Sequence, residues 1–119
     1  HPAFLGSFVT SPQQGISHGV LFGKLMRIAG ADIAIFPNFG GRFSFTQEQC
    51  AEIRFAAQEK IGHIRPSWIS PAGGMQLDRI DSMIGFYGKD TASLIGGALH
   101  DGDLLTNATA MVEKIHSHS

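Results

Sequence analysis

Hydrophobic positions along the chain alternate between helical spacing and short continuous runs. From Ile16 to Ala29 the apolar residues recur every three or four positions, and Gly30 follows as a helix stop signal. Residues 32–36 then form a short apolar run with β-branched side chains, closed by Pro37, which is typical of a buried strand. This stretch predicts a helix followed by a strand.

A second strand and helix order follows. Thr46 and Gln49 have the spacing of a capping box, which predicts a helix that runs from there to Lys60. Residues 65–70 form the next short apolar segment, and they predict a strand that ends before Pro71.

The remaining residues repeat the order once more. Residues 77–87 carry a helical apolar stripe, and residues 91–95 form a third apolar run that predicts a strand. Asp103 is positioned to cap a last helix through Ile115, and we expect the polar tail of residues 116–119 to be frayed.

Alternation of buried strands with helices indicates parallel βαβ units in an α/β fold. A complete (β/α)8 barrel takes about 250 residues in eight strands, so this chain of 119 residues corresponds to part of one. The first residue is His1, with no charged or apolar leader after it, so we expect the protein to continue upstream. A doubly wound parallel sheet has the same local pattern, and the pattern leaves both architectures open.

Composition narrows the function classes. The chain is 43% hydrophobic and 16% charged, which is ordinary for a globular protein. No apolar run approaches the roughly 20 residues that cross a bilayer, so we expect no membrane partner. The formal net charge of −1 gives no electrostatic case for a nucleic-acid partner. An anionic ligand would have to be bound by local groups.

Neither the cysteine nor the histidines indicate a reactive or metal site. The single cysteine, Cys50, lies in a predicted helix with no histidine near it in sequence, so we interpret it as structural and expect a reducing, cytoplasmic location. The histidines lack the spacing of metal ligands. We therefore expect no metal site within this chain.

Two glycine pairs stand at equivalent positions in consecutive units. Gly73–Gly74 follows the second predicted strand and Gly96–Gly97 follows the third. Glycine has no Cβ, so an anion can approach its backbone N–H group, and a following helix N-terminus adds partial positive charge. In β/α barrels, phosphate is frequently held by the loops after the seventh and eighth strands. The pairs predict a phosphate site, with two tight turns as the alternative.

A third loop, residues 37–45, leaves its strand at the same end and carries Gly40, Gly41 and Arg42. The Arg42 guanidinium offers a charged, planar donor fork that suits a carboxylate or phosphate, and the glycines would let the loop close. Because barrel enzymes place catalytic groups at this end, we predict that Arg42 closes over a bound anion. The alternative is a solvated surface charge.

Taken together, these motifs resemble a known family. The run from Gly30 to Phe43, with Ser70–Gly74 and Leu94–Gly97, is similar to the C-terminal barrel half of the RuBisCO large-chain superfamily. More narrowly, the opening His1–Phe8 and the loop Phe36–Arg42 resemble form IV, the RuBisCO-like proteins.

The resemblance implies a fold and a register. Residues 1–119 would be the C-terminal portion of a TIM-type (β/α)8 barrel, from the loop after the fifth strand through the eighth helix. His1 would end the fifth strand, and the three predicted strands would be the sixth, seventh and eighth. Residues 2–15 would be loop, although the stretch from Phe4 to Thr10 also has some strand propensity.

The resemblance also implies roles for individual residues. In the family, the glycines that match Gly74 and Gly96–Gly97 bind one substrate phosphate, and Gly73 stands beside them. His1 would orient the substrate or shuttle a proton, and Arg42 would close over the reacting end. The family's Mg2+ ligands belong to the second strand, which lies outside this chain.

Departures from the family pattern argue against carbon fixation. True carboxylases carry an arginine where this sequence has Pro2, a histidine near Ile35 and a serine at Ala72, and these residues hold a second phosphate and nearby sugar oxygens. They also carry a lysine at Arg42. Arginine and lysine differ in shape and hydration, so that exchange is not conservative at a catalytic position.

We therefore predict that the full-length parent is an enzyme of the enolase, isomerase or decarboxylase type. It would form a Mg2+-stabilised enediolate from a sugar or sugar-acid monophosphate, or from a methylthio-sugar phosphate. The resemblance implies a homodimer, and we expect the fragment alone to be inactive. The alternatives are a fragment of a true ribulose-bisphosphate carboxylase large chain and a non-catalytic phosphate-binding half barrel.

Overall fold

The computed structural model describes residues 1, 5–9, 11, 13–43 and 45–118. Pro2, where carboxylases carry an arginine, lies outside the described residues. Elements η1, η3 and η4 are 3-10 turns and η2 is a π-helix. In chain order the elements are η1 (Leu5–Ser7), η2 (Gly19–Leu25), α1 (Met26–Ile28), β1 (Ile33–Pro37), α2 (Gln47–Gln58), β2 (Trp68–Ala72), η3 (Leu77–Arg79), α3 (Ile80–Tyr87), η4 (Gly97–His100) and α4 (Leu104–Ser117).

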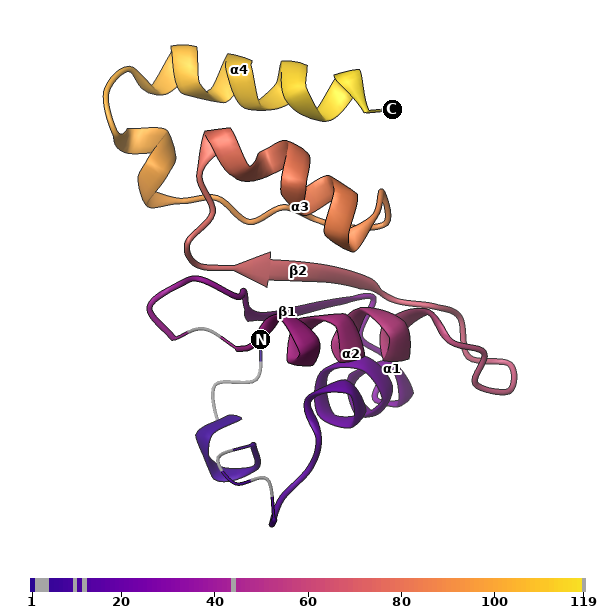
Figure 1. Cartoon of the computed structure of the whole chain (residues 1–119). Coiled ribbons are helices and arrows are strands. Elements are labelled where there is room, and N and C mark those ends of the chain that lie inside the picture. The colour runs from indigo at the N-terminus through magenta and orange to yellow at the C-terminus, as the bar shows by residue number, and fades with distance from the viewer. Residues whose placement is uncertain (2–4, 10, 12, 44, 119) are drawn as a thin grey trace.

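Strands β1 and β2 are parallel, with Ile33 opposite Trp68 and Pro37 opposite Ala72. Helix α2 connects them, so the predicted βαβ unit is confirmed. Figure 1 shows α3 and α4 above the two strands and α1 and α2 below them. Before residue 16, the described residues contain the short turn η1 and no strand, as the family resemblance implied.

Strand β2 continues through Pro71, whereas the sequence predicted an end before it. The backbone N–H of Trp68 donates to Asp32, and the carbonyl of Ala72 accepts from Asn38, so these residues of β2 turn their backbone groups toward β1. Successive residues of a strand alternate in this respect, which turns the nitrogen of Pro71 away from β1. Its missing N–H therefore costs no bond to β1.

The prediction of a strand over residues 91–95 is wrong. Residues 91–95 lie beside β2 on the side away from β1. There the nitrogen of Pro71 has no hydrogen to donate, and the Ser70 hydroxyl instead donates to the carbonyl of Ala92 at 2.8 Å. The ladder is therefore interrupted, and the segment runs parallel to β2 without becoming a strand. The described segment is joined to β2 by isolated bridges: Ile69 with Thr91 and Ala72 with Leu94.

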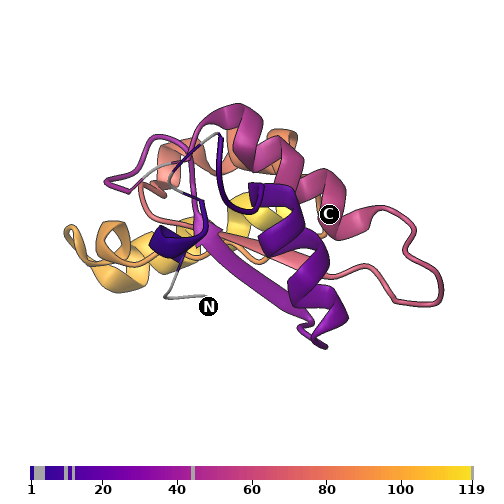
Figure 2. The same ribbon diagram turned by 90° about the horizontal axis from the view of Figure 1, so that it is seen from below.

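The first predicted helix, Ile16–Ala29, is confirmed in outline but begins at His18 and is π-wound from Gly19 to Leu25. It packs against α2, and Figure 2 shows the two helices running alongside each other. A Cβ built on Gly23 would lie 2.5 Å from the Cβ of Ala56 in α2. A glycine at this position therefore permits the close approach of the two helices.

Both ends of α2 are held by specific hydrogen bonds. At its start, the Gln49 N–H donates to Thr46 Oγ1 at 3.2 Å and the Thr46 N–H donates to Gln49 Oε1 at 2.8 Å, which confirms the capping box. At its end, the buried guanidinium of Arg27 donates to the carbonyl oxygens of Ala56 and Glu59 at 2.8 and 3.0 Å. A buried cation is thus satisfied by carbonyls that the helix leaves unpaired.

Helices α3 and α4 follow the predicted ranges, but the expected fraying of the tail is wrong. Residues 116 and 117 belong to α4, and His118 Nε2 lies 2.9 Å from Asp81 Oδ1 on α3. Lys114 Nζ donates to the other oxygen of Asp81 at 3.1 Å. These two partners lower the pKa of the Asp81 carboxyl, His118 contributing first. A side-chain cluster between the helices therefore orders the tail through His118.

The core joins both strands to the helices on either side. Cys50 belongs to it, and burial raises the pKa of its thiol, so the structural interpretation of this cysteine agrees with its surroundings. The buried members of the core cluster are Leu21, Phe22, Phe36, Cys50, Ile53, Ala57, Ile69, Met75, Met83 and Tyr87.

The close contact at Gly23 predicts the effect of adding one methyl group. Gly23→Ala should lower the free energy of unfolding by about 1–3 kcal/mol, because the new methyl group overlaps Ala56. Urea denaturation measures this change. The matched control is Gly85→Ala on α3, where no atom lies within 4 Å of the new Cβ, so helix propensity should raise stability by about 0.5–1 kcal/mol. Equal effects of the two variants would contradict this account.

Candidate functional site

The loops that carry the predicted site residues leave one edge of the structure. Strands β1 and β2 are parallel, so the loops after Pro37 and Ala72 start at the same end. In Figure 1 the purple loop after β1, the arrowhead of β2 and the orange turn η4 all lie at the left of the molecule. We call residues 38–43 the arginine loop and Gly73–Gly74 the glycine turn.

Two hollows open at this edge, and they share the glycine turn. The first, called the glycine hollow, is lined by both glycine pairs, Gly73–Gly74 and Gly96–Gly97. The second, called the arginine hollow, is lined by His1 and Arg42 together with Gly73–Gly74. The structure thus brings all six predicted site residues around the glycine turn. Their roles stay predictions.

The glycines differ in what surrounds them. At Gly73, Gly96 and Gly97 no atom lies within 4 Å of the place a Cβ would occupy, so these three face open space. At Gly74, which has a φ of +67°, a Cβ would lie 2.9 Å from the Cα of Gly41. Three glycines therefore leave room for a ligand, and Gly74 instead permits contact between two backbones.

That contact docks the arginine loop on the glycine turn. A Cβ on Gly41 would in turn lie 3.0 Å from the carbonyl carbon of Gly73, so both sides of the contact require glycine. Arg42 follows directly and is exposed, with its guanidinium carbon 5.3 Å from the centre of the Phe43 ring. Within the described residues no carboxylate lies within 4 Å of the Arg42 guanidinium. Its charge is therefore available to an anion.

A buried polar residue at the start of the arginine loop was missed by the sequence analysis. Asn38 directly follows β1, and its Oδ1 accepts a 2.6 Å hydrogen bond from the hydroxyl of Tyr87 on α3. Its backbone N–H donates to the carbonyl of Ala72 at 2.8 Å. Asn38 thus ties the start of the arginine loop to the end of β2 and to α3. The sequence shows only a polar residue after an apolar run, which is equally typical of an exposed loop residue.

Burial makes the groups behind the loop unreactive. Burial raises the pKa of the Tyr87 hydroxyl far above its ordinary value, and its hydrogen bonding with Cys50 adds to the shift. Tyr87 therefore keeps its proton and donates a hydrogen bond to Asn38 at all ordinary pH values. The acid–base candidates at this edge are the exposed side chains, among them His1.

Carboxylates are also present, but they do not form a metal site. Asp78 and Asp101 line the glycine hollow. Within the described residues, no group of three or more histidine, cysteine, aspartate or glutamate side chains is placed to hold a metal ion. No described helix is long and apolar enough to cross a membrane.

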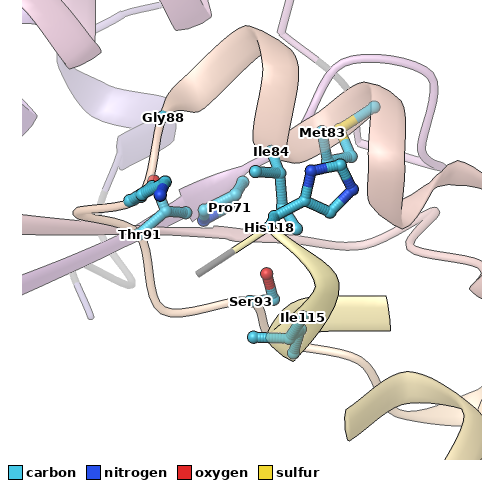
Figure 3. Close-up of a pocket in the computed structure, with 9 residues that line it drawn as sticks. Pro71, Met83, Ile84, Gly88, Thr91, Ser93, Ile115 and His118 are labelled. Carbon is cyan, nitrogen blue, oxygen red and sulfur yellow. The ribbon is translucent and has the colours of Figure 1, made fainter. Parts of the chain in front are cut away.

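A separate cavity of about 150 Å3 lies between α3, residues 91–93 and α4. Figure 3 shows that it is bordered mainly by apolar side chains, including Met83, Ile84 and Ile115, with His118 at one side. None of the six predicted site residues lines it. It is therefore a gap beside the helices and does not belong to the candidate site.

The chain is similar to proteins of known identity along most of its length. It is 40% identical over 99% of its residues to ribulose bisphosphate carboxylase-like protein 1 of Rhodopseudomonas palustris, of which it covers 31%. It is 43% identical over 92% to 5-methylthioribulose-1-phosphate isomerase of Rhodospirillum rubrum, covering 28% of that protein. It is 30% identical over 84% to 2,3-diketo-5-methylthiopentyl-1-phosphate enolase of Bacillus cytotoxicus, covering 24%. No family model matches the chain.

The fold of the chain is also similar to that of RuBisCO-like proteins. The whole chain superposes on 30% of the crystal structure of a Rubisco-like protein from Rhodopseudomonas palustris, with a TM-score of 0.83 and 33% identity. The chain belongs to the RuBisCO large-chain superfamily. Its matches are RuBisCO-like proteins, which confirms the resemblance stated from its motifs. The chain spans about a third or less of the length of the curated relatives it matches.

The Tyr87–Asn38 bond predicts a stability effect at the base of the arginine loop. Tyr87→Phe leaves Asn38 Oδ1 buried without its partner, so we expect the free energy of unfolding to fall by about 1–3 kcal/mol. Thermal or urea denaturation measures it. Ser117→Ala removes an exposed hydroxyl and should change stability by less than about 0.5 kcal/mol. A Tyr87→Phe variant as stable as this control would show that the buried bond is unimportant.

Proposed function

We propose that residues 1–119 form the C-terminal part of a (β/α)8 barrel and supply the phosphate side of a RuBisCO-like active site. The observation that carries this proposal is that both glycine pairs line one hollow, next to the Arg42 guanidinium, which has no carboxylate partner among the described residues. In this assignment β1 and β2 are the sixth and seventh barrel strands, and residues 91–95 take the eighth position. The parallel α/β arrangement and its match to a RuBisCO-like structure support it.

The glycine hollow is the proposed phosphate site. At Gly73, Gly96 and Gly97 nothing occupies the space of a Cβ, so an anion could come close to the backbone there. The helical stretch that begins at Leu77 starts three residues after Gly74 and places its positive end on this side. Asp78 and Asp101 would oppose an anion at the rim, where water weakens their effect.

The arginine hollow is the proposed place for the rest of the substrate. Beside His1 and Arg42, its wall is mainly apolar and includes Phe36, Phe43 and Ala72. An apolar wall suits a small uncharged group better than a second phosphate, which would need charged or hydrogen-bonding partners. The names of two relatives specify methylthio-substituted compounds with one phosphate. We therefore propose a methylthio-sugar phosphate, or a closely related sugar or sugar-acid monophosphate, as the substrate.

The proposed chemistry starts with proton abstraction beside a carbonyl group. A base removes the proton, the C–H electron pair forms a carbon–carbon double bond, and negative charge collects on the carbonyl oxygen as an enediolate. Arg42 would stabilise that oxygen, and the His1 imidazole would move a proton at the same end. An isomerase reaction is completed when the former carbonyl carbon takes a proton and the oxygen on the adjacent carbon becomes the new carbonyl. An enolase reaction is completed when the charged oxygen takes the proton. Decarboxylation of a β-keto acid would form an enolate of the same kind by loss of CO2.

A Mg2+ ion is part of the proposal for the whole protein only. The described residues of this chain offer no set of three ligands for a metal, so its ligands would lie outside the chain. A cytoplasmic location and a homodimer remain proposals of the same kind. A true carboxylase is the less favoured alternative, because Arg42 and Ala72 replace the lysine and serine of carboxylases.

Substitution of one open glycine tests the phosphate site. In the protein as its gene encodes it, Gly96→Val should weaken binding of 5-methylthioribulose 1-phosphate at least about tenfold, equivalent to ~1.4 kcal/mol, because the side chain enters the space left for the phosphate. Isothermal titration calorimetry measures the affinity. Gly85→Ala on α3 is the control and should leave it unchanged. If Gly96→Val binds as tightly as this control, the glycine hollow is not the phosphate site.

Isotope exchange tests the proposed reaction. The encoded protein with Mg2+ should catalyse incorporation of deuterium from D2O beside the carbonyl of 5-methylthioribulose 1-phosphate, which proton NMR follows. The same preparation should fix no labelled CO2 on ribulose bisphosphate. Robust fixation would favour the carboxylase alternative, and the absence of both reactions would favour a non-catalytic binding role.

A further inference from the structure

One guanidinium outside both hollows contacts the two loops that form them. Arg79 Nη1 donates to the carbonyl oxygen of Gly74 at 3.3 Å. The same nitrogen would lie 3.1 Å from a Cβ built on Gly40, and the guanidinium carbon lies 5.8 Å from the centre of the Phe39 ring. Arg79 therefore bridges the glycine turn and the arginine loop, although it lines neither hollow.

We propose that Arg79 is a positioning residue that holds the arginine loop on the glycine turn, and thereby sets the place of Arg42 relative to the phosphate site. The expected effect on substrate binding rests on the proposed function. The contacts of Arg79 with the two loops, which we call the Arg79 latch, are seen in the structure itself. Within the described residues no carboxylate lies within 4 Å of the Arg79 guanidinium, so no ion pair draws it away from these contacts.

The backbone of Arg79 is fixed by hydrogen bonds at the start of α3. Arg79 ends η3 and stands immediately before α3, where its carbonyl accepts a 2.8 Å hydrogen bond from the hydroxyl of Ser82. The Arg79 N–H donates to the carbonyl of Gln76 at 3.1 Å. The side chain therefore extends from a fixed turn toward a loop that carries two adjacent glycines.

The bond to Gly74 also orients a peptide group of the glycine hollow. The carbonyl of Gly74 and the N–H of Met75 belong to one planar trans peptide, so they point in opposite directions. While Arg79 holds the carbonyl, the N–H of Met75 is directed away from Arg79. Met75 lines the glycine hollow, so the bond to Gly74 restrains the orientation of a peptide group at its wall, although Arg79 itself does not line it.

The guanidinium shape matters for both contacts. A planar guanidinium can lie over an aromatic ring and donate from its edge at the same time, whereas the lysine ammonium is a compact, strongly hydrated charge. Arg79→Lys should therefore keep the positive charge but lose the contact over Phe39. Arg79→Gln should lose both the positive charge and the contact over Phe39.

Hydrogen–deuterium exchange tests the latch without any ligand. In the protein as its gene encodes it, Arg79→Gln should raise the exchange rate of residues 38–43 several-fold and leave α2 unchanged, and Arg79→Lys should give an intermediate increase. Arg54→Gln, on the exposed side of α2, is the matched control and should change nothing in the arginine loop. If Arg79→Gln and Arg54→Gln give the same loop exchange, the proposal is wrong. If Arg79→Gln unfolds the protein, Arg79→Lys decides the test. An exchange rate of residues 38–43 in Arg79→Lys equal to that of the wild type would then overturn the proposal.

A double-mutant cycle tests the consequence for binding. With 5-methylthioribulose 1-phosphate as the probe, Arg42→Gln should weaken affinity about tenfold in the wild type but less than about threefold when Arg79→Gln is already present. Independent, multiplicative effects would refute the coupling. Absence of binding by the wild type would refute the proposed function instead, and the exchange experiment would still decide the role of Arg79.

Discussion

The candidate site depends on the contact between the backbones of Gly41 and Gly74. A single Cβ on either residue would press into the other loop, since the nearest atoms lie 2.9 to 3.0 Å from the position of that Cβ. Because neither side can accept a side chain, the arginine loop and the glycine turn behave as one surface. His1, Arg42 and both glycine pairs are arranged around that surface, so the contact decides which groups a ligand can meet together.

The surface is supported by polar groups that are satisfied inside the core. Asn38 connects the end of β1 to β2 and Tyr87, and Arg27 is satisfied by carbonyl oxygens at the end of α2. Each would be costly to bury alone, because an unpaired polar group loses its hydration. Once paired, each fixes the relative position of two elements. The strand ends are therefore held by buried hydrogen bonds where the glycine-rich loops begin.

The features that depend on residues close together in the sequence could be predicted from the sequence alone. The capping box at Thr46, the helices α3 and α4, and the placement of Gly73–Gly74 directly after β2 follow from spacing and residue type. The predicted end of β2 before Pro71 and the predicted strand over residues 91–95 were wrong for another reason. The nitrogen of Pro71 faces away from β1, so its missing N–H interrupts pairing with residues 91–95 and not with β1. Asn38 and Arg79 were missed for a related reason, since their partners lie far from them in sequence or in another loop.

The division of the edge into two hollows limits how a substrate can lie. The glycine turn belongs to both, with open glycines on one side and His1 and Arg42 on the other. A phosphate in the glycine hollow would place the carbon chain across the turn, and the reacting carbons would reach Arg42 with an apolar wall beyond them. Beside His1 and Arg42, the wall at that far end is mainly apolar and includes Phe36, Phe43 and Ala72. Under the proposed function, such an edge would suit a substrate with one charged end and one uncharged end better than a bisphosphate, because an apolar wall offers a second phosphate few hydrogen-bonding partners.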